Sequence, residues 1–305
     1  MRLGVAGCGR IAERGYIPAA LSTPGVEIVA FTDPDQERLE RCLGACGPGG
    51  EAEGCDGIAS LLERASIDLL VVATPAATHL PLAQAAAAAG VRSLVEKPPA
   101  ADLDGAQRLA ALDPEPLAAF NRRFLQGAEL REAVPAEGWL ELDLELRFQR
   151  AGWGAHEARD EALLDAGVHL VDLACHLSEA TPVAVRRAET SPERAQFELE
   201  LSRGRARISC ATDRRYRELV EVRDRSGKLL GRSVLGQVRG RLAALRGAPD
   251  PLVLSLSRQL AALRDGRPVA TAGDGAVVMA VVEAVRRSAE LDGAEVTVAP
   301  VGAAA

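Results

Sequence analysis

The feature that most constrains the fold of this chain is a change in the pattern of apolar residues near residue 121. Upstream of it, short apolar runs such as Leu69–Ala73 alternate with segments of helical periodicity. Downstream, Trp139–Phe148 alternates strictly between apolar and polar side chains. An apolar run suits a strand covered on both faces in a parallel sheet, whereas alternation suits a strand with one packed and one solvated face. The sequence therefore predicts an α/β part followed by a part built on antiparallel strands.

The upstream part predicts a doubly wound parallel sheet, because strands and helices alternate along it. Strands are predicted at Arg2–Val5, Glu27–Phe31, Leu69–Ala73, Ser93–Glu96 and Pro116–Phe120. Helices are predicted at Ile11–Ser22, Gln36–Leu43, Ile58–Ala65, Leu80–Ala89 and Asp102–Leu112, and Gly44–Gly57 is expected to be a loop.

The downstream part predicts an α+β domain with a largely antiparallel open sheet. Its predicted strands are Trp139–Phe148, Val183–Glu189, Gln196–Leu201, Ala206–Ala211, Leu219–Arg223 and Leu229–Val234, and later helices are predicted at Pro251–Arg264 and Asp274–Leu291. At 305 residues the chain exceeds what one hydrophobic core usually supports, so two domains are expected. We place the boundary at residue 121, which gives domains of residues 1–121 and 122–305.

Charge and apolar content argue against several classes of function. The formal net charge is -7, and nucleic-acid binding needs a basic face, so no nucleic-acid partner is expected. No apolar segment has the length to span a bilayer, and Met1–Gly7 enters a strand without a secretory signal, so we expect a cytoplasmic protein. The six cysteines form no CxxC pair, and no histidine lies near Cys42, Cys46 and Cys55; structural or surface thiols are expected rather than a metal site.

A phosphate-binding loop is predicted directly after the first strand. The segment from Gly7 to Ala12 fits the pattern GxGxxA and opens a helix. Gly7 permits the tight turn, and Gly9 lets the backbone approach a diphosphate. Arg10 and Ile11 are candidate cofactor contacts, because free N–H groups at the start of a helix attract an anion. These features predict a Rossmann domain.

The second predicted strand leads to Asp33, at the position of the acidic residue that binds the adenosine ribose in such domains. Its carboxylate can accept hydrogen bonds from ribose hydroxyls and would repel a 2′-phosphate by about a few kcal/mol. This favours NAD as the cofactor, with NADP as the alternative. In the competing interpretation, the glycines form an ordinary turn and Asp33 caps the following helix.

Further motifs give the chain a specific family resemblance. They are Ala73-Thr74-Pro75 with His79, Glu96-Lys97-Pro98, Asn121-Arg122-Arg123-Phe124, and the segment from Leu164 to Asp172 that contains Asp165-Ala166-Gly167-Val168-His169. Together with the glycine loop they resemble the Gfo/Idh/MocA oxidoreductases, and the match follows the same order along nearly the whole chain. The resemblance implies an NAD(P)-dependent oxidoreductase acting on CH-OH groups.

The resemblance also implies roles for individual residues. Lys97 would lie beside the nicotinamide and the substrate hydroxyl, with Glu96 fixing its loop. Asp165 and His169 would be the catalytic residues of the active-site helix. Thr74, Pro75 and His79 would line the cofactor channel, while Asn121 and Arg123 would lie near the nicotinamide and substrate.

The helix around His169 carries the chemistry that such a reaction needs. Asp165, His169, Asp172 and His176 follow the spacing i, i+4, i+7, i+11, which an α-helix places on one face. Histidine titrates near working pH, and a carboxylate one turn away can orient its ring. We therefore expect His169 to be the general acid/base, oriented by Asp165, with Lys97 polarising the reacting oxygen.

Several alternatives stay open at this point. The Asp–His helix could be a buried polar network, or Asp165, His169 and His176 could bind a metal, although their spacing fits no familiar zinc pattern. His79 could be a helix-start residue without ligand contact. Trp153 could close over substrate or anchor a loop. The chain could also be an NAD-dependent glycosidase that oxidises, eliminates and reduces, or a cofactor-binding regulator without turnover.

Substrate and assembly follow only from the resemblance and from the second sheet. The resemblance suggests a sugar, a cyclitol or a related polyol, or the ketone derived from one. The alternating strands predict a large half-apolar sheet, which monomers rarely leave uncovered, and the resemblance adds to the expectation of a homodimer or homotetramer.

Overall fold

The computed structural model describes residues 1–47, 52–150, 160–236 and 249–302. Within these ranges the chain forms two compact units. The first unit consists of residues 1–121 together with 250–276, and the second consists of 122–249 and 277–302. Our sequence prediction assigns all residues after 121 to the second domain, whereas the segment 250–276 folds with the first unit. No helix among the described residues has the length and apolar character needed to cross a membrane.

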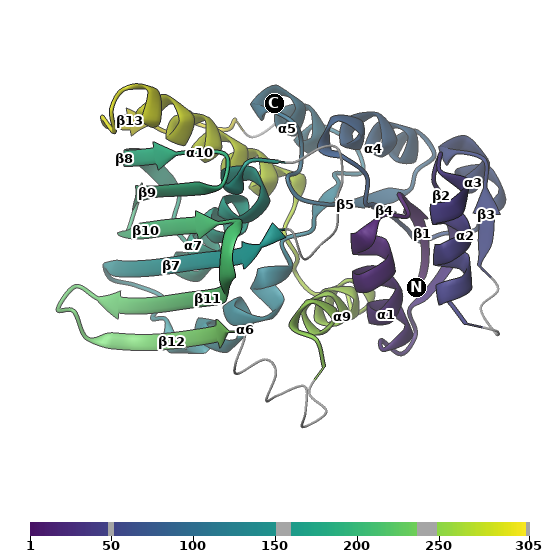
Figure 1. Ribbon diagram of the computed structural model, residues 1–305, viewed down its shortest axis with the longest axis horizontal. Helices are drawn as coiled ribbons and strands as arrows, with labels where there is room; N and C mark the ends of the chain where they lie inside the picture. The colour runs from purple at the N-terminus through teal and green to yellow at the C-terminus, as the bar shows by residue number, and fades with distance from the viewer. Residues whose placement is uncertain (48–51, 151–159, 237–248, 303–305) are drawn as a thin grey trace. The chain divides into compact units, whose positions relative to one another are not determined.

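The first unit contains a parallel sheet of six strands in the order β3-β2-β1-β4-β5-β6 (Figure 1). Its strands are β1 (Arg2–Ala6), β2 (Glu27–Thr32), β3 (Glu53–Cys55), β4 (Leu69–Val72), β5 (Arg92–Val95) and β6 (Leu117–Ala118). The predicted doubly wound sheet is confirmed, and five of these strands lie where the sequence predicts them. β3 lies in the predicted loop Gly44–Gly57, because its sequence Glu-Gly-Cys has no apolar run to mark it.

Helical segments follow most of these strands. They are η1 (Ala12–Tyr16), α1 (Ile17–Leu21), α2 (Gln36–Ala45), α3 (Ile58–Arg64), η2 (Ala76–Thr78), α4 (His79–Ala88) and α5 (Leu103–Ala110), and α9 (Pro251–Arg264) joins them from far along the chain. Leu256 and Leu260 of α9 are fully buried in the same core as Tyr16 and Ile17. The Ser257 and Ser22 hydroxyls lie 2.8 Å apart, so polar contacts also fix α9 to the first helices.

The second unit contains a mixed, mostly antiparallel sheet of seven strands in the order β12-β11-β7-β10-β9-β8-β13 (Figure 1). Its strands are β7 (Leu140–Gln149), β8 (Pro182–Thr190), β9 (Arg194–Leu201), β10 (Gly204–Ala211), β11 (Asp213–Asp224), β12 (Leu229–Gly236) and β13 (Val296–Thr297). The pair β7–β10 is parallel, and the other pairs are antiparallel. The predicted antiparallel domain is therefore confirmed, with one parallel pair at its centre.

Helices supply the core on one face of this sheet. They are η3 (Asn121–Phe124), α6 (Gln126–Leu130), η4 (Arg131–Ala133), η6 (Leu163–Gly167), α7 (Val168–Ser178) and α10 (Ala272–Glu290), of which η3 and α10 begin in the first unit. Alternate residues of β7, such as Leu142 and Leu144, are buried, as are Val168 and Val171 of α7.

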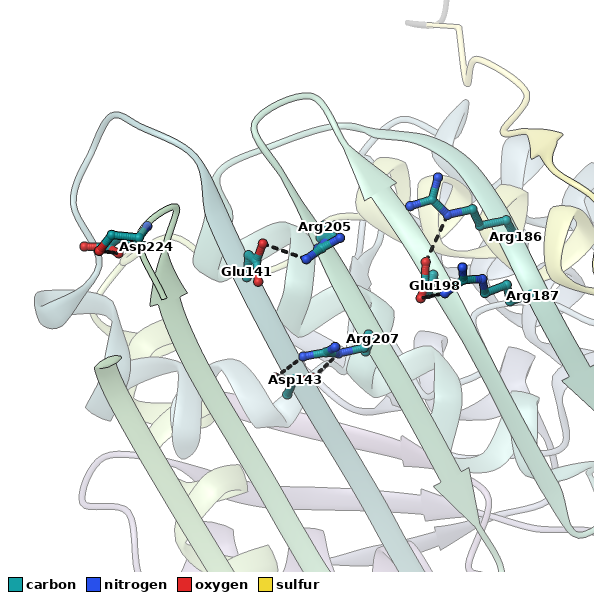
Figure 2. Close-up of polar contacts among 9 residues, drawn as sticks. Glu141, Asp143, Arg186, Arg187, Glu198, Arg205, Arg207 and Asp224 are labelled. Carbon is teal, nitrogen blue, oxygen red and sulfur yellow. Dashed lines mark hydrogen bonds and ion pairs between the residues drawn. The ribbon is translucent and has the colours of Figure 1, made fainter. Parts of the chain in front are cut away.

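The other face of the sheet carries many charged side chains, and arginines of β8 and β10 pair with carboxylates of their neighbours β9 and β7. Figure 2 shows arginines of β8 and β10 directed at carboxylates of β9 and β7. Arg207 Nε donates to Asp143 Oδ1 at 2.6 Å, and Arg186 Nε donates to Glu198 Oε2 at 2.9 Å. Opposite charges on these neighbouring strands satisfy one another, so this part of the face is charged rather than half-apolar.

Candidate active site

The predicted nucleotide-binding residues of the first unit lie at one edge of its sheet. The glycine loop follows β1, Asp33 follows β2, Thr74 follows β4 and Lys97 follows β5. Because all four strands are parallel, their carboxyl ends meet at the same edge. β1 lies between β2 and β4, where the strand order reverses, and such a switch point is where open α/β sheets bind ligands.

The glycine loop has the geometry that its sequence predicts. Gly7 has a φ of +98°, and a Cβ there would lie 2.5 Å from the Ala73 carbonyl oxygen, so only glycine fits. A Cβ on Gly9 would meet nothing within 4 Å, which leaves open space beside the backbone. Glu13 N–H donates to Gly9 O at 3.0 Å, so helical hydrogen bonding begins at Gly9. The amides just after it occupy the start of a helix, where anions bind.

Asp33 is held at the tip of this loop. Its Oδ2 accepts the Cys8 N–H at 2.7 Å, and its Oδ1 accepts the Asp35 N–H at 2.8 Å. The cap of helix α2 is Asp35, whose Oδ1 accepts the Arg38 N–H at 3.0 Å. Asp33 therefore ties the end of β2 to the glycine loop instead of serving as the helix cap.

The cysteines of this region are free thiols. Cys8 lies between the two glycines, and its thiol is hydrogen-bonded to that of Cys42 on α2. That bond and burial raise the pKa of the Cys8 thiol. Cys46 Sγ donates to the Cys42 carbonyl oxygen at 3.5 Å. Cys8 and Cys42 are buried where α2 packs beneath the loop, which suits a structural role.

His79 joins the loops that follow β4 and β5. It is fully buried; its Nε2 lies 2.7 Å from Thr74 O, and its Nδ1 lies 3.2 Å from Pro99 O. The neighbouring Thr78 hydroxyl donates to Thr74 Oγ1 at 2.8 Å. The predicted cofactor channel residues Thr74 and Pro75 thus belong to a loop braced by His79, whose ring lies behind that loop.

Glu96 anchors the loop of Lys97. Its side chain is buried, and its Oε1 accepts the Tyr16 hydroxyl at 2.8 Å while its Oε2 accepts the Lys97 N–H at 3.1 Å. Burial raises the pKa of Glu96, and the charge of Lys97 and the Tyr16 hydroxyl oppose that rise. Burial, followed by the nearby carboxylate, raises the pKa of Tyr16. Sequence reasoning missed Tyr16, because a tyrosine in the first helix has the pattern of a core residue.

Asn121 closes this edge of the sheet. It is buried after β6, and its Nδ2 donates to Ser255 Oγ of α9 at 3.2 Å. The sequence motif predicts Asn121, whereas its partner lies 134 residues further along the chain and has no motif to mark it.

The predicted catalytic helix of the second unit consists of two kinds of turn. Asp165 lies in η6, a π-helical turn, and the buried His169 and Asp172 lie in the α-helix α7. A π turn is wider than an α turn, so the α-helical spacing that predicts one shared face does not apply across residues 163–167. Such turns are rare in proteins overall, and those that occur often lie at functional sites.

Arginines bind both acids of this helix. Asp165 Oδ2 accepts from Arg150 Nε at 3.1 Å and from Arg150 Nη2 at 2.7 Å. Asp172, only 1% exposed, accepts from Arg123 Nε at 3.1 and 3.0 Å and from Arg123 Nη2 at 2.5 Å. Arg123, a predicted substrate contact, is thus locked in a bidentate pair. Arg150 was missed in the sequence, and the predicted substrate contact Trp153 lies outside the described residues.

Comparison with known proteins identifies the first unit. Residues 1–115 match the family described as an oxidoreductase family with an NAD-binding Rossmann fold. A dTDP-3,4-didehydro-2,6-dideoxy-alpha-D-glucose 3-reductase of Streptomyces antibioticus is 40% identical over 112 residues, which are 37% of this chain and 33% of that protein. Inositol 2-dehydrogenase 4 of Saccharopolyspora erythraea is 33% identical over 135 residues, or 44% of this chain and 38% of that protein. Each match spans less than half of the curated relative.

The whole chain shares its fold with a solved structure. The myo-inositol dehydrogenase from Lactobacillus casei, in complex with NAD(H) and myo-inositol, aligns with a TM-score of 0.78 over 99% of this chain and 98% of its own. The identity is 19%, so this likeness concerns the fold alone. Residues 1–115 thus carry the NAD-binding Rossmann domain of the GFO_IDH_MocA oxidoreductase family.

Proposed function

We propose that this protein is an NAD-dependent oxidoreductase acting on a secondary alcohol, or the corresponding ketone, of a sugar, cyclitol or related polyol. The observation that carries the proposal is the sheet edge at which the glycine loop, Asp33 and Lys97 all follow parallel strands. A sensor of the nucleotide needs only the loop, whereas Lys97 adds a group able to act on substrate. The names of the sugar reductase and the inositol dehydrogenase motivate the substrate class.

The residues of the first unit fit a dinucleotide. The space beside Gly9 would admit a diphosphate to the backbone, and the following amides would bind it. Asp33, with lone pairs beyond those used by Cys8 and Asp35, would accept the ribose hydroxyls and disfavour the 2′-phosphate of NADP. When bound, NAD would accept or supply the hydride, while the protein contributes positioning.

Proton movement is assigned to two residues. Lys97 would donate a hydrogen bond to the reacting oxygen and polarise it. His169 would take up the hydroxyl proton during oxidation and return it during reduction. The carboxylate of Asp165, held by Arg150, would position the ring of His169. Arg123 would contact the substrate, and its ion pair with Asp172 would fix the orientation of its guanidinium group. The proposal requires Lys97 and His169 to meet beside the nicotinamide.

The test is a panel of sugars, cyclitols and polyols with their ketones, followed by NADH absorbance with NAD and with NADP. Turnover on one class, faster with NAD, is the expected result. Release of a leaving group without net change in NADH would favour the glycosidase alternative. Nucleotide binding without turnover on any compound would favour a regulator and overturn the proposal.

We also propose a homodimer or homotetramer, and the charged sheet face gives this a specific test. A pairing through that face would exchange ion pairs such as Arg207–Asp143 between copies, and salt would weaken it. Sedimentation should then show dissociation as salt rises from low ionic strength to about 1 M. Association unchanged by salt would exclude this face, and a monomer at every salt concentration would exclude oligomerisation.

A further inference from the structure

We propose that Tyr16 is a positioning residue for Lys97, acting through Glu96. The inference rests on the proposed function, because it assigns Lys97 to the reacting oxygen. It concerns a contact that no motif marks: one buried carboxylate receives a hydroxyl from the first helix with one oxygen and the backbone of Lys97 with the other.

The contact joins two parts of the proposed cofactor site. Tyr16 lies in the π turn η1, immediately after the glycine loop, whereas Glu96 directly follows β5. The bond between them spans 80 residues of sequence at 2.8 Å. A rigid link of this kind fixes the loop of Lys97 relative to the helix that would receive the diphosphate. The backbone of Lys97 would thereby keep a fixed position relative to a dinucleotide bound at that helix.

Packing alone does not explain a tyrosine at this position. Tyr16 is fully buried, and phenylalanine would fill nearly the same volume without a hydroxyl to desolvate. Among the described residues, the hydroxyl is compensated by its bond to Glu96, which is itself buried. A buried polar pair gains little for stability compared with an apolar one, so its specific effect is on the orientation of the group it holds.

The pair also sets the charge beside Lys97. The ionisable groups acting on Glu96 are Tyr16 from η1 and Lys97 in its own loop. Burial favours the neutral acid, while the Tyr16 hydroxyl and the Lys97 ammonium favour the carboxylate. Without the hydroxyl the pKa of Glu96 rises further, and less carboxylate faces Lys97 at a given pH. If the activity needs this carboxylate, the acidic limb of the pH profile then moves to higher pH.

The chain provides a matched control. Its only other tyrosine, Tyr216, donates to Glu218 Oε1 at 2.9 Å in the second unit. Glu218 is also buried, but Arg122 pairs with it at 2.9 Å, and no lysine lies next to it in sequence. Tyr216→Phe thus removes the same kind of bond from a buried glutamate without affecting Lys97.

The experiment compares Tyr16→Phe and Tyr216→Phe in the full chain. For Tyr16→Phe we expect kcat to fall about tenfold and the acidic limb of the pH profile to move up by about one unit, since a hydrogen bond to a charge is lost. The Kd for NADH, followed by fluorescence, and the substrate KM should stay within about twofold, because no binding contact changes. Tyr216→Phe should leave all four quantities at the wild-type values.

A second readout does not depend on turnover. The chain has only two lysines, Lys97 and Lys228, so amine labelling by trinitrobenzenesulfonate can be assigned to each by mass spectrometry. In Tyr16→Phe, Lys97 should be labelled about threefold faster relative to Lys228, because the loop of Lys97 opens more often once the bond between Tyr16 and Glu96 is lost. Glu96→Gln should reproduce this change in labelling, and it replaces Tyr16→Phe in the test if Tyr16→Phe does not fold.

The outcomes separate the inference from the proposed function. If the wild-type protein turns over but Tyr16→Phe keeps its kcat, pH profile and Lys97 labelling, the positioning role is wrong. If no compound is turned over, the proposed function fails, and Lys97 labelling alone decides whether Tyr16 acts on Lys97. Equal loss of activity in both tyrosine variants would indicate general destabilisation and overturn the inference.

Discussion

The two candidate sites of this chain differ in the groups that shape them, backbone in one and side chains in the other. The nucleotide edge of the first unit is shaped by backbone: the positive φ of Gly7, the open space at Gly9 and the amides that hold Asp33. The Asp–His helix of the second unit is shaped by side chains, with Arg150 on Asp165 and Arg123 on the buried Asp172. A backbone site depends on local residue types, whereas a side-chain site depends on partners brought from elsewhere.

This difference predicts how each site fails. In the first unit, Gly7 sets the backbone turn and Gly9 leaves open space beside the backbone, so substitution of Gly7 should act on folding and substitution of Gly9 on ligand binding. In the second unit, substitution of His169 should act on chemistry, whereas substitution of Arg123 should act on stability through the buried Asp172. Five substitutions test the contrast, in order of decreasing expected effect.

His169→Gln should lower turnover by about 10²–10⁴, because a general acid/base is lost while the amide keeps a similar volume. The Kd for NADH, measured by fluorescence, should remain at the wild-type value. His176→Gln, on the same helix, is the control and should keep most of the activity. Unchanged turnover in His169→Gln would remove this residue from the mechanism and leave the helix with a structural role only.

Arg123→Ala should destabilise the second unit by about 3–5 kcal/mol, because it removes a bidentate arginine from the buried carboxylate of Asp172. Urea unfolding measures the loss. Arg123→Ala combined with Asp172→Ala should recover part of that stability, since the uncompensated charge is then absent. A double variant no more stable than the single one would show that packing, and not the ion pair, is responsible.

Gly7→Ala should cost about 1–3 kcal/mol of stability, because its positive φ and the nearby Ala73 carbonyl strain any side chain. Gly9→Ala should leave the melting temperature unchanged, since its Cβ meets nothing within 4 Å, but should weaken NADH binding at least about tenfold by blocking close approach of the diphosphate. Calorimetry and fluorescence titration separate the two effects. Full NADH affinity in Gly9→Ala would show that the dinucleotide does not bind over this loop.

Arg207→Ala should change stability by less than about 1 kcal/mol, because its pair with Asp143 lies on the solvated sheet face, where Arg207 is 58% exposed. Thermal unfolding at low and high salt measures it, with Arg123→Ala as the reference. A loss as large as that of the buried pair would show that the face is covered in solution, as a dimer through this sheet would require.

The sequence predicts the first unit better than the second for a physical reason. Gly7, Gly9 and Asp33 have their roles within one βαβ unit, where short-range spacing defines the backbone. Tyr16 and Ser255 act on Glu96 and Asn121 across 80 and 134 residues, and their types fit an ordinary core helix. No local pattern could mark them.

Charge patterns in the sequence likewise predict a local element but not its partner from a distant part of the chain. The alternation in Trp139–Phe148 correctly predicts β7, but it does not show that β10 lies parallel beside it with the opposite charge. Asp165 and His169 are marked by their motif, whereas the π turn between residues 163 and 167 comes from the packed structure. The assignment of Lys97 and His169 to one catalytic centre stays a prediction.

The return of α9 to the first unit has a consequence for synthesis. Leu256 and Leu260 complete the core that holds Tyr16, so the dinucleotide domain cannot close before residue 264 has left the ribosome. The nascent chain carries an incomplete nucleotide domain while the intervening 128 residues are translated, 122 to 249 by the limits of the second unit. A fragment ending at residue 121 would expose that apolar surface, so we expect the Rossmann unit not to fold stably as one contiguous piece.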